Sequence, residues 1–354
     1  MSLSGAAVRR ARVRAQGLVA GAGDGVEEVV GRVVGIQAQD AGAAALSIRP
    51  RGSGLVAGDV NRALVEGSIV LTWTLRGTRH YHRAVDVRWL VGLFGPVFGR
   101  PGRRARQLGI DGAVGERAVA ALGRALADSG PLTRPQVREL LAPMGVDPSG
   151  QAPVHVLFRA ACDGVLCVVP GPRAEGGERY VLLDDWVPPG SSPADPAAEL
   201  ARRYLAAFGP ATPADLAAWS GLPAGLVRDA WSAIASKLVE VRWSDGSAWV
   251  LRDHADALDG LGAAGTEPAP VRMLGGFDTF LLGYADRTLH LPPEHVRSVN
   301  AGGGIVKPVV LDDGRVVGTW SLDRRRTPQV TPFSGEAPDT TAEATDIARF
   351  LAVS

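Results

Sequence analysis

Two glutamines, Gln37 and Gln39, flank Ala38 in the segment Gly35-Ile36-Gln37-Ala38-Gln39-Asp40. Each side-chain amide offers a carbonyl acceptor and two N–H donors but does not titrate. The chemistry open to this pair is therefore hydrogen bonding and dipole orientation rather than proton transfer. The simplest interpretation is structural, because apolar residues predict a helix over 25–36 and most polar side chains bond backbone or water. The motif alone does not decide between a structural and a chemical role.

The sequence lacks the usual signatures of metal, phosphate or nucleophilic chemistry. Cys162 and Cys167 lie in an apolar stretch and are predicted to be buried thiols, since no Cys/His cluster supplies further ligands. No phosphate-binding glycine loop or nucleophile elbow occurs. The only lysines, Lys237 and Lys307, are distant from the glutamines in sequence, which disfavours an amine nucleophile. We expect neither a cofactor nor a metal.

Composition predicts a soluble globular chain of several modules. The 354 residues are 46% hydrophobic and 21% charged, and no run approaches the ~20 apolar residues of a membrane span. The N-terminus carries Arg9, Arg10, Arg12 and Arg14 without an apolar signal core, so we expect a cytoplasmic, nucleoid-associated protein and no membrane partner.

Charge is unevenly distributed along the chain. The overall net charge is +1, but residues 1–110 contain 16 arginines and 7 acidic residues, a net of +9, and residues 111–354 carry −8. Such an uneven charge distribution is typical of a protein that binds an anionic polymer through one basic face. The same charge count would result if the arginine-rich helices simply faced solvent and bound no polymer.

A helix, turn, helix, hairpin pattern occurs three times, which is typical of winged helices. The last copy has helices over 212–219 and 224–236, with Thr212 as N-cap, and strands over 238–243 and 248–251. The middle copy has Thr133 as a cap, and the first copy is more divergent. In the middle copy we predict a helix near 151–163 and strands near 166–169 and 179–183. In the first copy we predict helices near 5–17, 25–36 and 57–65 and strands near 72–75 and 78–83. Winged helices read DNA, but they also serve as protein-interaction modules.

The predicted fold class is α+β, with three tandem winged-helix modules followed by a small antiparallel β-barrel or sheet. We place the modules at 1–110, 111–190, 191–265 and 266–354, with a linker at 187–193. In the last module we expect strands over 279–284, 305–310 and 315–321.

Four stretches resemble the winged-helix DNA glycosylase family that includes the azinomycin self-resistance enzyme of actinomycetes. They are residues 35–40 (GIQAQD), 72–80 (TWTLRGTRH), 276–287 (GFDTFLLGYADR) and 313–320 (DGRVVGTW). The resemblance implies three winged helices in a C-shape with a terminal β-barrel. The two-glutamine motif resembles the azinomycin-resistance branch, whereas a branch acting on simpler alkylated bases carries Gln-apolar-Asp there.

The resemblance implies excision of cationic N7-alkylpurines, with interstrand crosslinks as further substrates. An N7-alkylguanine leaves as a neutral base, so the enzyme must mainly stabilise an oxocarbenium-like sugar and place a water. Gln37 and Gln39 would be the catalytic residues, one positioning water and the other holding the sugar or the water. Which glutamine does which is open. The scarcity of lysine favours a monofunctional enzyme that hydrolyses the bond.

Arginines and histidines at three places are candidate contacts to double-stranded DNA. They are Arg76, Arg79, His80 and His82 on the first hairpin, Arg103, Arg104 and Arg106 between modules, and Arg324, Arg325 and Arg326 after a strand. For the hairpin, a core-facing role for alternate residues is an equal alternative. Asp278 and Asp286 are predicted to be structural, in a turn and an ion pair with Arg287.

Three classes of function remain open: a glycosylase, a non-catalytic winged-helix regulator, and a scaffold for another repair protein. A regulator usually dimerises on a two-fold site, whereas three unlike modules in one chain favour a monomer. The paired glutamines separate the classes, because only the glycosylase requires them.

Overall fold

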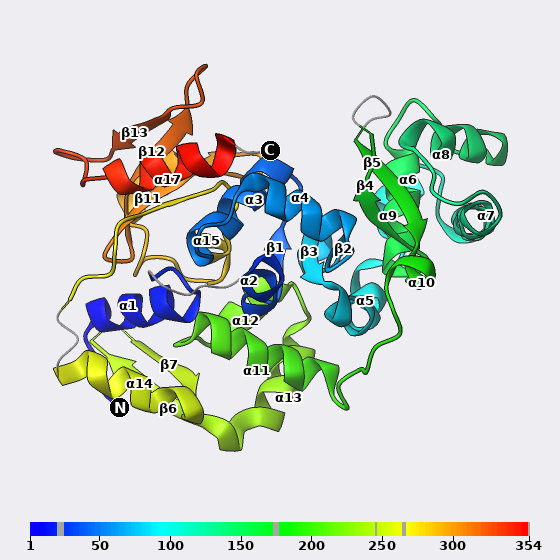
Figure 1. The fold of residues 1–354 in the computed structure, drawn as a ribbon. Helices are drawn as coiled ribbons and strands as arrows, with labels where there is room; N and C mark the ends of the chain where they lie inside the picture. The colour runs from blue at the N-terminus through cyan, green and yellow to red at the C-terminus, as the bar shows by residue number, and fades with distance from the viewer. Residues whose placement is uncertain (20–24, 173–176, 245, 264–266, 353–354) are drawn as a thin grey trace. The chain divides into compact units, whose positions relative to one another are not determined.

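The chain divides into two compact units. The computed structural model describes residues 1–19, 25–172, 177–244, 246–263 and 267–352. One unit joins residues 1–60 to residues 197–354, and the other is the continuous stretch 61–196 (Figure 1). Both contain helices and antiparallel strands, so the expected α+β class is confirmed. The predicted module boundary at 265 lies outside the described residues.

The unit of residues 61–196 contains one antiparallel sheet flanked by helices. Its strands follow the order β3-β2-β4-β5, with Leu71 of β2 opposite Tyr81 of β3 and Val168 of β4. The strands are β2 (Ile69–Trp73), β3 (Arg79–Arg83), β4 (Leu166–Pro170) and β5 (Glu178–Leu182). The helices are α5 (Ala84–Phe98), α6 (Arg103–Gln107), α7 (Gly112–Ser129), α8 (Arg134–Leu141), α9 (Ala152–Cys162) and α10 (Leu183–Trp186). α4 (Ala57–Val65) leads the chain into this unit.

The predicted N-cap of α8 is confirmed. The Thr133 hydroxyl accepts from the backbone N–H of Gln136, and the Gln136 side chain accepts from the Thr133 N–H, which completes a capping box. α9, β4 and β5 follow close to their expected positions. Residues 187–193, expected as a linker, form no helix or strand before α11 (Pro196–Phe208).

The other unit contains the clearest of the three repeated patterns. α12 (Pro213–Ser220) and α13 (Ala224–Ile234) precede the hairpin of β6 (Leu238–Trp243) and β7 (Gly246–Leu251). Thr212 and Asp215 form a capping box, and Pro213 stands at the first helical position, where its missing N–H has no helical partner to lose. Gly221 ends α12 at φ 74°, a left-handed conformation that glycine adopts without steric cost.

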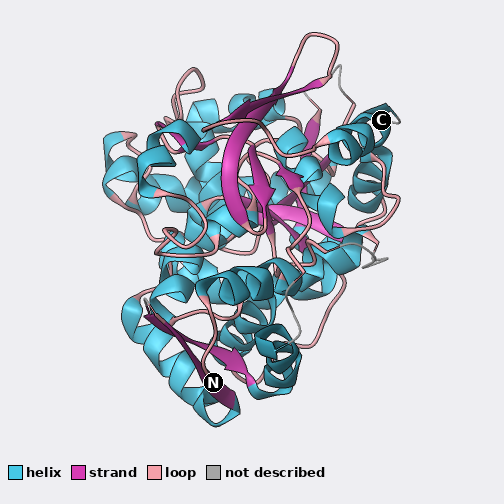
Figure 2. Ribbon diagram, turned by 90° about the vertical axis from the view of Figure 1, so that its left-hand side faces the viewer, coloured by secondary structure: helices cyan, strands magenta, loops and turns pink. Residues whose placement is uncertain are grey.

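The N-terminal helix packs against this hairpin. α1 (Gly5–Ala15) begins at Ser4, whose side chain accepts from the Ala7 N–H at 3.1 Å. Its residues Ala7 and Val8 share a buried core with Val241 and Val250 of the hairpin, and α14 (Arg252–Ala263) contacts both strands. Figure 2 shows a two-stranded hairpin beside the N-terminus, with helices next to it. Residues far apart in sequence therefore form one core.

The C-terminal region forms an open four-stranded antiparallel sheet in the order β13-β12-β11-β8. Its strands are β8 (Arg272–Leu274), β11 (Val309–Asp312), β12 (Arg315–Leu322) and β13 (Pro328–Pro332). β9 (Asn300–Gly302) pairs separately with β10 (Ile305–Val306), after the short helix α16 (Val296–Val299). The expected alternative of a closed barrel is therefore wrong for the described residues. α17 (Thr341–Ala352) packs on the sheet through Ile347, which shares a core with Val310 and Trp320.

One predicted strand in this region was wrong. Residues 279–282 form the short helix α15 (Thr279–Leu282), because the Asp278 side chain accepts from the Phe280 N–H at 2.9 Å and caps the first turn. Phe280 and Leu281 are both buried, so periodicity could not distinguish a helix from a strand here. None of the described helices combines the length and apolar character that crossing a membrane requires.

Candidate active site

The two glutamines lie in a short segment between two helices, not at the end of one. α2 (Val26–Arg32) stops before Val34, whose φ of 65° is left-handed and unusual for a β-branched residue. The chain then extends as β1 (Ile36–Gln37), so the predicted helix over 25–36 was too long. Strain of this kind persists only where the surrounding structure enforces it, and here it directly precedes the motif.

The side chains of Gln37 and Gln39 bond to each other. Gln37 Nε2 donates to Gln39 Oε1 at 3.0 Å. Gln37 is 8% exposed, whereas Gln39 is exposed to solvent. The buried amide therefore orients the exposed one. Neither group changes charge with pH, so the pair presents fixed dipoles.

The helix after the motif is fixed at its start. Asp40 is the N-cap of α3 (Ala41–Ile48), and its Oδ1 accepts from the Ala43 N–H at 2.8 Å. A side chain on Gly275 would place its Cβ 2.7 Å from the Ala43 carbonyl oxygen. Glycine at this position therefore lets the C-terminal region approach the backbone of α3 closely.

Buried arginines fix the other end of α3. Arg51, in a 3-10 turn (Arg49–Arg51), donates to both carboxylate oxygens of Asp278 at 2.7 and 2.8 Å. Both side chains are fully buried. Arg51 also donates to the Ser47 carbonyl and the Gln16 side chain. Hydrogen bonds on several sides are what make a buried ion pair favourable.

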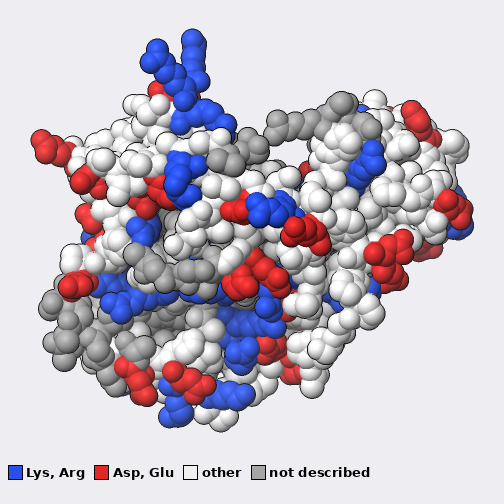
Figure 3. All heavy atoms as spheres, viewed as in Figure 1, with Lys and Arg blue, Asp and Glu red and all other residues white. Residues whose placement is uncertain are grey.

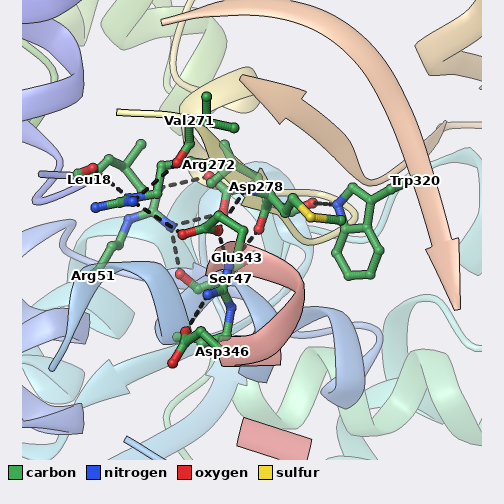
Figure 4. Close-up of polar contacts among 12 residues, drawn as sticks. Leu18, Ser47, Arg51, Val271, Arg272, Asp278, Trp320, Glu343 and Asp346 are labelled. Atoms are coloured by element: carbon green, nitrogen blue, oxygen red, sulfur yellow. Dashed lines mark hydrogen bonds and ion pairs between the residues drawn. The ribbon is translucent and has the colours of Figure 1, made fainter. Parts of the chain in front are cut away.

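Arg49 extends this network to the C-terminal helix, whose Glu343 and Asp346 lie near Arg51 and Arg272 in Figure 4. It donates to Glu343 at 2.7 Å and pairs with Asp346, both on α17, and it also donates to the Met273 carbonyl at 2.8 Å. Glu343 in turn accepts from Arg272 at 3.1 Å. These contacts tie α3, β8 and α17 into one rigid support for the segment that carries Gln37 and Gln39.

The expected ion pair with Arg287 was wrong. Asp278 pairs with Arg51, and Asp286 accepts from the backbone N–H of Thr288 at 2.8 Å. The structural role expected for both aspartates stands, but the partner of Asp278 lies 227 residues away.

The hairpin candidates for DNA contact differ in accessibility. Arg79 is partly exposed and pairs with Glu178 at 2.5 Å, and Arg76 is partly exposed at φ 54°. His80 and His82 are 3% and 0% exposed. His82 bonds to the Thr74 hydroxyl at 2.7 Å, and burial holds the pKa of His80 well below its usual value. These two histidines therefore lie inside the fold and are not presented at its surface.

The other arginine groups lie at the surface. Arg103, Arg104 and Arg106 are exposed on α6, and Arg104 donates to Gln151 at 2.7 Å. The run 324–326 is exposed in the turn between β12 and β13, where basic side chains project from the molecule (Figure 3). Asp323 shapes that turn by accepting from the Arg325 N–H at 2.8 Å.

Comparison with known proteins identifies the family. The sequence profile described as DNA glycosylase AlkZ-like matches residues 30–352. The chain belongs to this family.

A curated member of the AlkZ-like family from Streptomyces sahachiroi, named interstrand DNA cross-link repair glycosylase, is 31% identical over 344 residues. The match covers 88% of this chain and 85% of that protein. The solved structure of Streptomyces sahachiroi DNA glycosylase AlkZ superposes with a TM-score of 0.84 at 28% identity. It covers 99% of this chain and 97% of that one.

Sequence reasoning missed the internal arginines of this AlkZ-like chain. Arg12 is 4% exposed, donates to the Pro210 carbonyl at 2.9 Å and lies 3.9 Å from the Tyr284 ring centre. Its Nη1 is 2.9 Å from Nε2 of the buried His290, whose Nδ1 is 3.1 Å from the Gly314 carbonyl oxygen. The apolar residues that flank Arg12 in α1 are the only local signal that this face of the helix is buried.

The prediction that both cysteines are buried thiols is confirmed. Cys162 and Cys167 are free, buried thiols, and burial raises the pKa of each to about 12. Lys237 and Lys307 are exposed. In the described ranges, no three His, Cys, Asp or Glu side chains converge as a metal ion would need.

Proposed function

We propose that this protein is a monofunctional DNA glycosylase that hydrolyses the N-glycosidic bond of cationic N7-alkylpurines in double-stranded DNA. The observation that carries the proposal is the direct bond between Gln37 and Gln39, in a chain of the AlkZ-like family. A regulator or scaffold needs no such pair of linked amides ahead of a rigidly held helix.

The leaving group does much of the chemical work. Alkylation at N7 gives the purine a positive charge, so departure of the base with the electron pair of the C1′–N9 bond yields a neutral product. The sugar becomes an oxocarbenium-like cation, and a water then forms the new C1′–O bond and releases its proton to solvent. An enzyme accelerates this step mainly by positioning the water and stabilising the cation.

The geometry suggests a division of roles between the glutamines. Gln39 is exposed, so we assign it to the water or the sugar. Gln37 is buried and donates to Gln39, so we assign it to holding the Gln39 amide in one orientation. A side-chain carbonyl directed at the sugar places negative potential where positive charge develops, without the pKa adjustment that a carboxylate needs.

We assign DNA binding to the exposed arginines of α6 and of the β12–β13 turn, with Arg76 and Arg79 as further contacts. Exposed guanidinium groups suit phosphates because of their planar donor geometry. The helix pair α12–α13 with the hairpin β6–β7 supports a winged-helix interpretation of that segment. His80 and His82 are left out of this interface because they are buried.

Interstrand crosslinks are included among the proposed substrates. A base tied to the opposite strand cannot be swung into a deep pocket, so an enzyme that acts on it needs its catalytic groups near the duplex surface. The exposure of Gln39 supports this, as does the name of the curated relative. Self-resistance to a DNA-alkylating natural product is the biological role we propose, for a monomer acting in the cytoplasm.

The test uses duplex DNA that contains one N7-methylguanine. Incubation with the protein should create an abasic site that breaks only after heating in alkali, because a monofunctional enzyme leaves the strand intact. A duplex with a uracil should stay uncut, since uracil is a neutral base. Strand breakage without alkali would contradict the monofunctional assignment, and efficient uracil excision would contradict the dependence on a cationic base.

A further inference from the structure

A cleft of about 600 Å³ lies between α5 and α9, within the unit of residues 61–196. Two glycines of α5, Gly92 and Gly95, line it, together with Gly99 at the C-cap of the helix. A Cβ on Gly95 would lie 2.1 Å from the Cys162 carbonyl oxygen, and one on Gly99 would lie 2.8 Å from the Cys162 Cβ. A Cβ on Gly92 would meet nothing within 4 Å. The two helices therefore touch at Gly95 and Gly99 and leave open space beside Gly92.

A second cavity of about 200 Å³ adjoins the cleft, because both are lined by Gly99, Arg100, Pro101 and Arg159. Its walls include the aromatic rings of Phe98 and Phe158. Together the two hollows combine apolar walls with two arginines at their junction. Such a combination suits an organic anion better than a purely apolar ligand.

Arg159 has unused hydrogen-bonding capacity. Its Nη1 is buried and has no hydrogen-bond partner in the described part of the chain. Its Nε lies 3.6 Å from Asp163 Oδ2, and its Nη2 lies 4.0 Å from Glu116 Oε1, which are ion-pair contacts but too long for hydrogen bonds. A buried charged donor without an acceptor is unfavourable. Nη1 lies beside Gly115, which lines the second cavity, and Arg159 itself lines both hollows, so a small shift of this side chain toward a bound acceptor would relieve the cost.

The remaining charges also favour an anion. Arg100 is exposed, and Arg104 of α6 lines the second cavity. Among the described residues that line either hollow, Asp163 is the one carboxylate. The Cys162 thiol has its pKa raised to about 12 by burial and so adds no negative charge.

We infer that the cleft between α5 and α9 binds the phosphate of a nucleotide unit. Arg159 and Arg100 bind the phosphate oxygens, and the apolar walls contact the attached sugar. Guanidinium groups match phosphate in shape and charge. The phosphate belongs either to a DNA strand or to a free nucleotide, and the inference does not depend on base excision.

Filling the cleft is the main test, made in the full-length protein. Gly92→Leu places a side chain in the open space, and replacing a glycine within a helix does not weaken the helix. Gly92→Ala is the matched control, because it makes the same backbone change and leaves most of the volume. Arg100→Ala removes one cation from the mouth. Arg117→Ala, at an exposed position of α7 outside the cleft, controls for loss of surface charge.

Two binding measurements separate the sources of the phosphate. Fluorescence anisotropy with an undamaged labelled duplex reports a DNA strand, and calorimetry with deoxyadenosine monophosphate reports a free nucleotide. We expect Gly92→Leu and Arg100→Ala to weaken one of these ligands about tenfold, and the two controls to have little effect. For the duplex, Arg100→Ala should also lower the salt slope by about 1, as loss of one phosphate contact does.

A response confined to the duplex identifies a DNA strand, and one confined to the mononucleotide identifies a free nucleotide. If Gly92→Leu folds normally by circular dichroism and binds both ligands like Gly92→Ala, the inference is overturned.

Discussion

Arg51 and Asp278 are 227 residues apart in the chain and form a two-point ion pair with both side chains fully buried. The pair joins the residues that follow α3 to the turn that begins α15. Because α3 follows the glutamine motif, this contact helps to fix where the motif stands. It also gives the aspartate of the sequence Gly276-Phe277-Asp278 a structural partner.

Asp278→Asn should strongly destabilise the protein. Removing one charge leaves the buried Arg51 without its counter-ion, a change that costs about 3–5 kcal/mol in buried pairs. Urea unfolding followed by circular dichroism measures the loss. Asp286→Asn, at an exposed position of the same motif, is the control and should cost much less. Equal losses for the two variants would remove the special role given to the buried pair.

Gln37→Ala and Gln39→Ala should each slow base excision at least about 100-fold in single-turnover assays, as loss of one preorganised dipole does elsewhere. Duplex affinity and urea stability should change little. Gln136→Ala removes an exposed glutamine from the capping box of α8, far from the motif in sequence, and should excise normally. If the activity of the motif variants falls only as far as their stability does, the glutamines are structural.

Replacing Arg324, Arg325 and Arg326 together by alanine should weaken duplex binding and flatten its dependence on salt. Each lost phosphate contact lowers the slope of log K against log salt by about 0.9. The turn should keep its shape, because Asp323 holds it through backbone N–H groups. Anisotropy titrations between 50 and 200 mM salt, about the range over which such contacts respond, measure the effect. Arg297→Ala, an exposed arginine elsewhere in this unit, is the control, and an unchanged slope in the triple variant would exclude the turn from the interface.

Stability should fall on mild acidification. Burial and the neighbouring Arg12 hold the pKa of His290 well below its usual value, and burial does the same for His80. Unfolded histidine has a pKa of about 6.5, so the unfolded state binds more protons as the pH falls below that value. The contribution of each buried, neutral histidine to the free energy of unfolding is therefore fully present above about pH 6.5. Below that pH the free energy of unfolding falls by up to about 1.4 kcal/mol per pH unit for each histidine.

Urea unfolding between about pH 7 and 5.5, above the range in which carboxylates titrate, measures this effect. His290→Gln keeps an acceptor for Arg12 and a donor for Gly314 but does not titrate, so its profile should be flatter. A protein that becomes more stable in this acid range would contradict the assignment.

Local signals in the sequence predicted part of the fold well. Thr133 and Thr212 were identified as helix N-caps because an N-cap needs only its own side chain and the next three residues. Residues 279–284 were misjudged because their state depends on burial from both sides and on the capping by Asp278. A run of apolar residues in the sequence reveals neither this burial nor this capping.

The glutamine motif was found through its resemblance to a family, and its geometry was not predictable. The left-handed Val34 and the bond between the two amides depend on how the chain is held by distant residues. The excess of arginine over residues 1–110 also does not translate fully into positive charge at the surface. Arg12, Arg49 and Arg51 are buried, so they serve the interior and contribute no exposed charge.

The packing of α1 on the β6–β7 hairpin has a consequence for protein synthesis. Residues 1–60 emerge from the ribosome first but share their core and their ion pairs with residues beyond 197. The stretch 61–196 is a continuous compact unit with its own helices and four paired strands, so we expect it to fold once it is made, since domains usually fold as units during translation. The segment that carries the two glutamines must therefore wait for the residues beyond 197, and a product that lacked them would expose the apolar face of α1 and lack the proposed catalytic geometry.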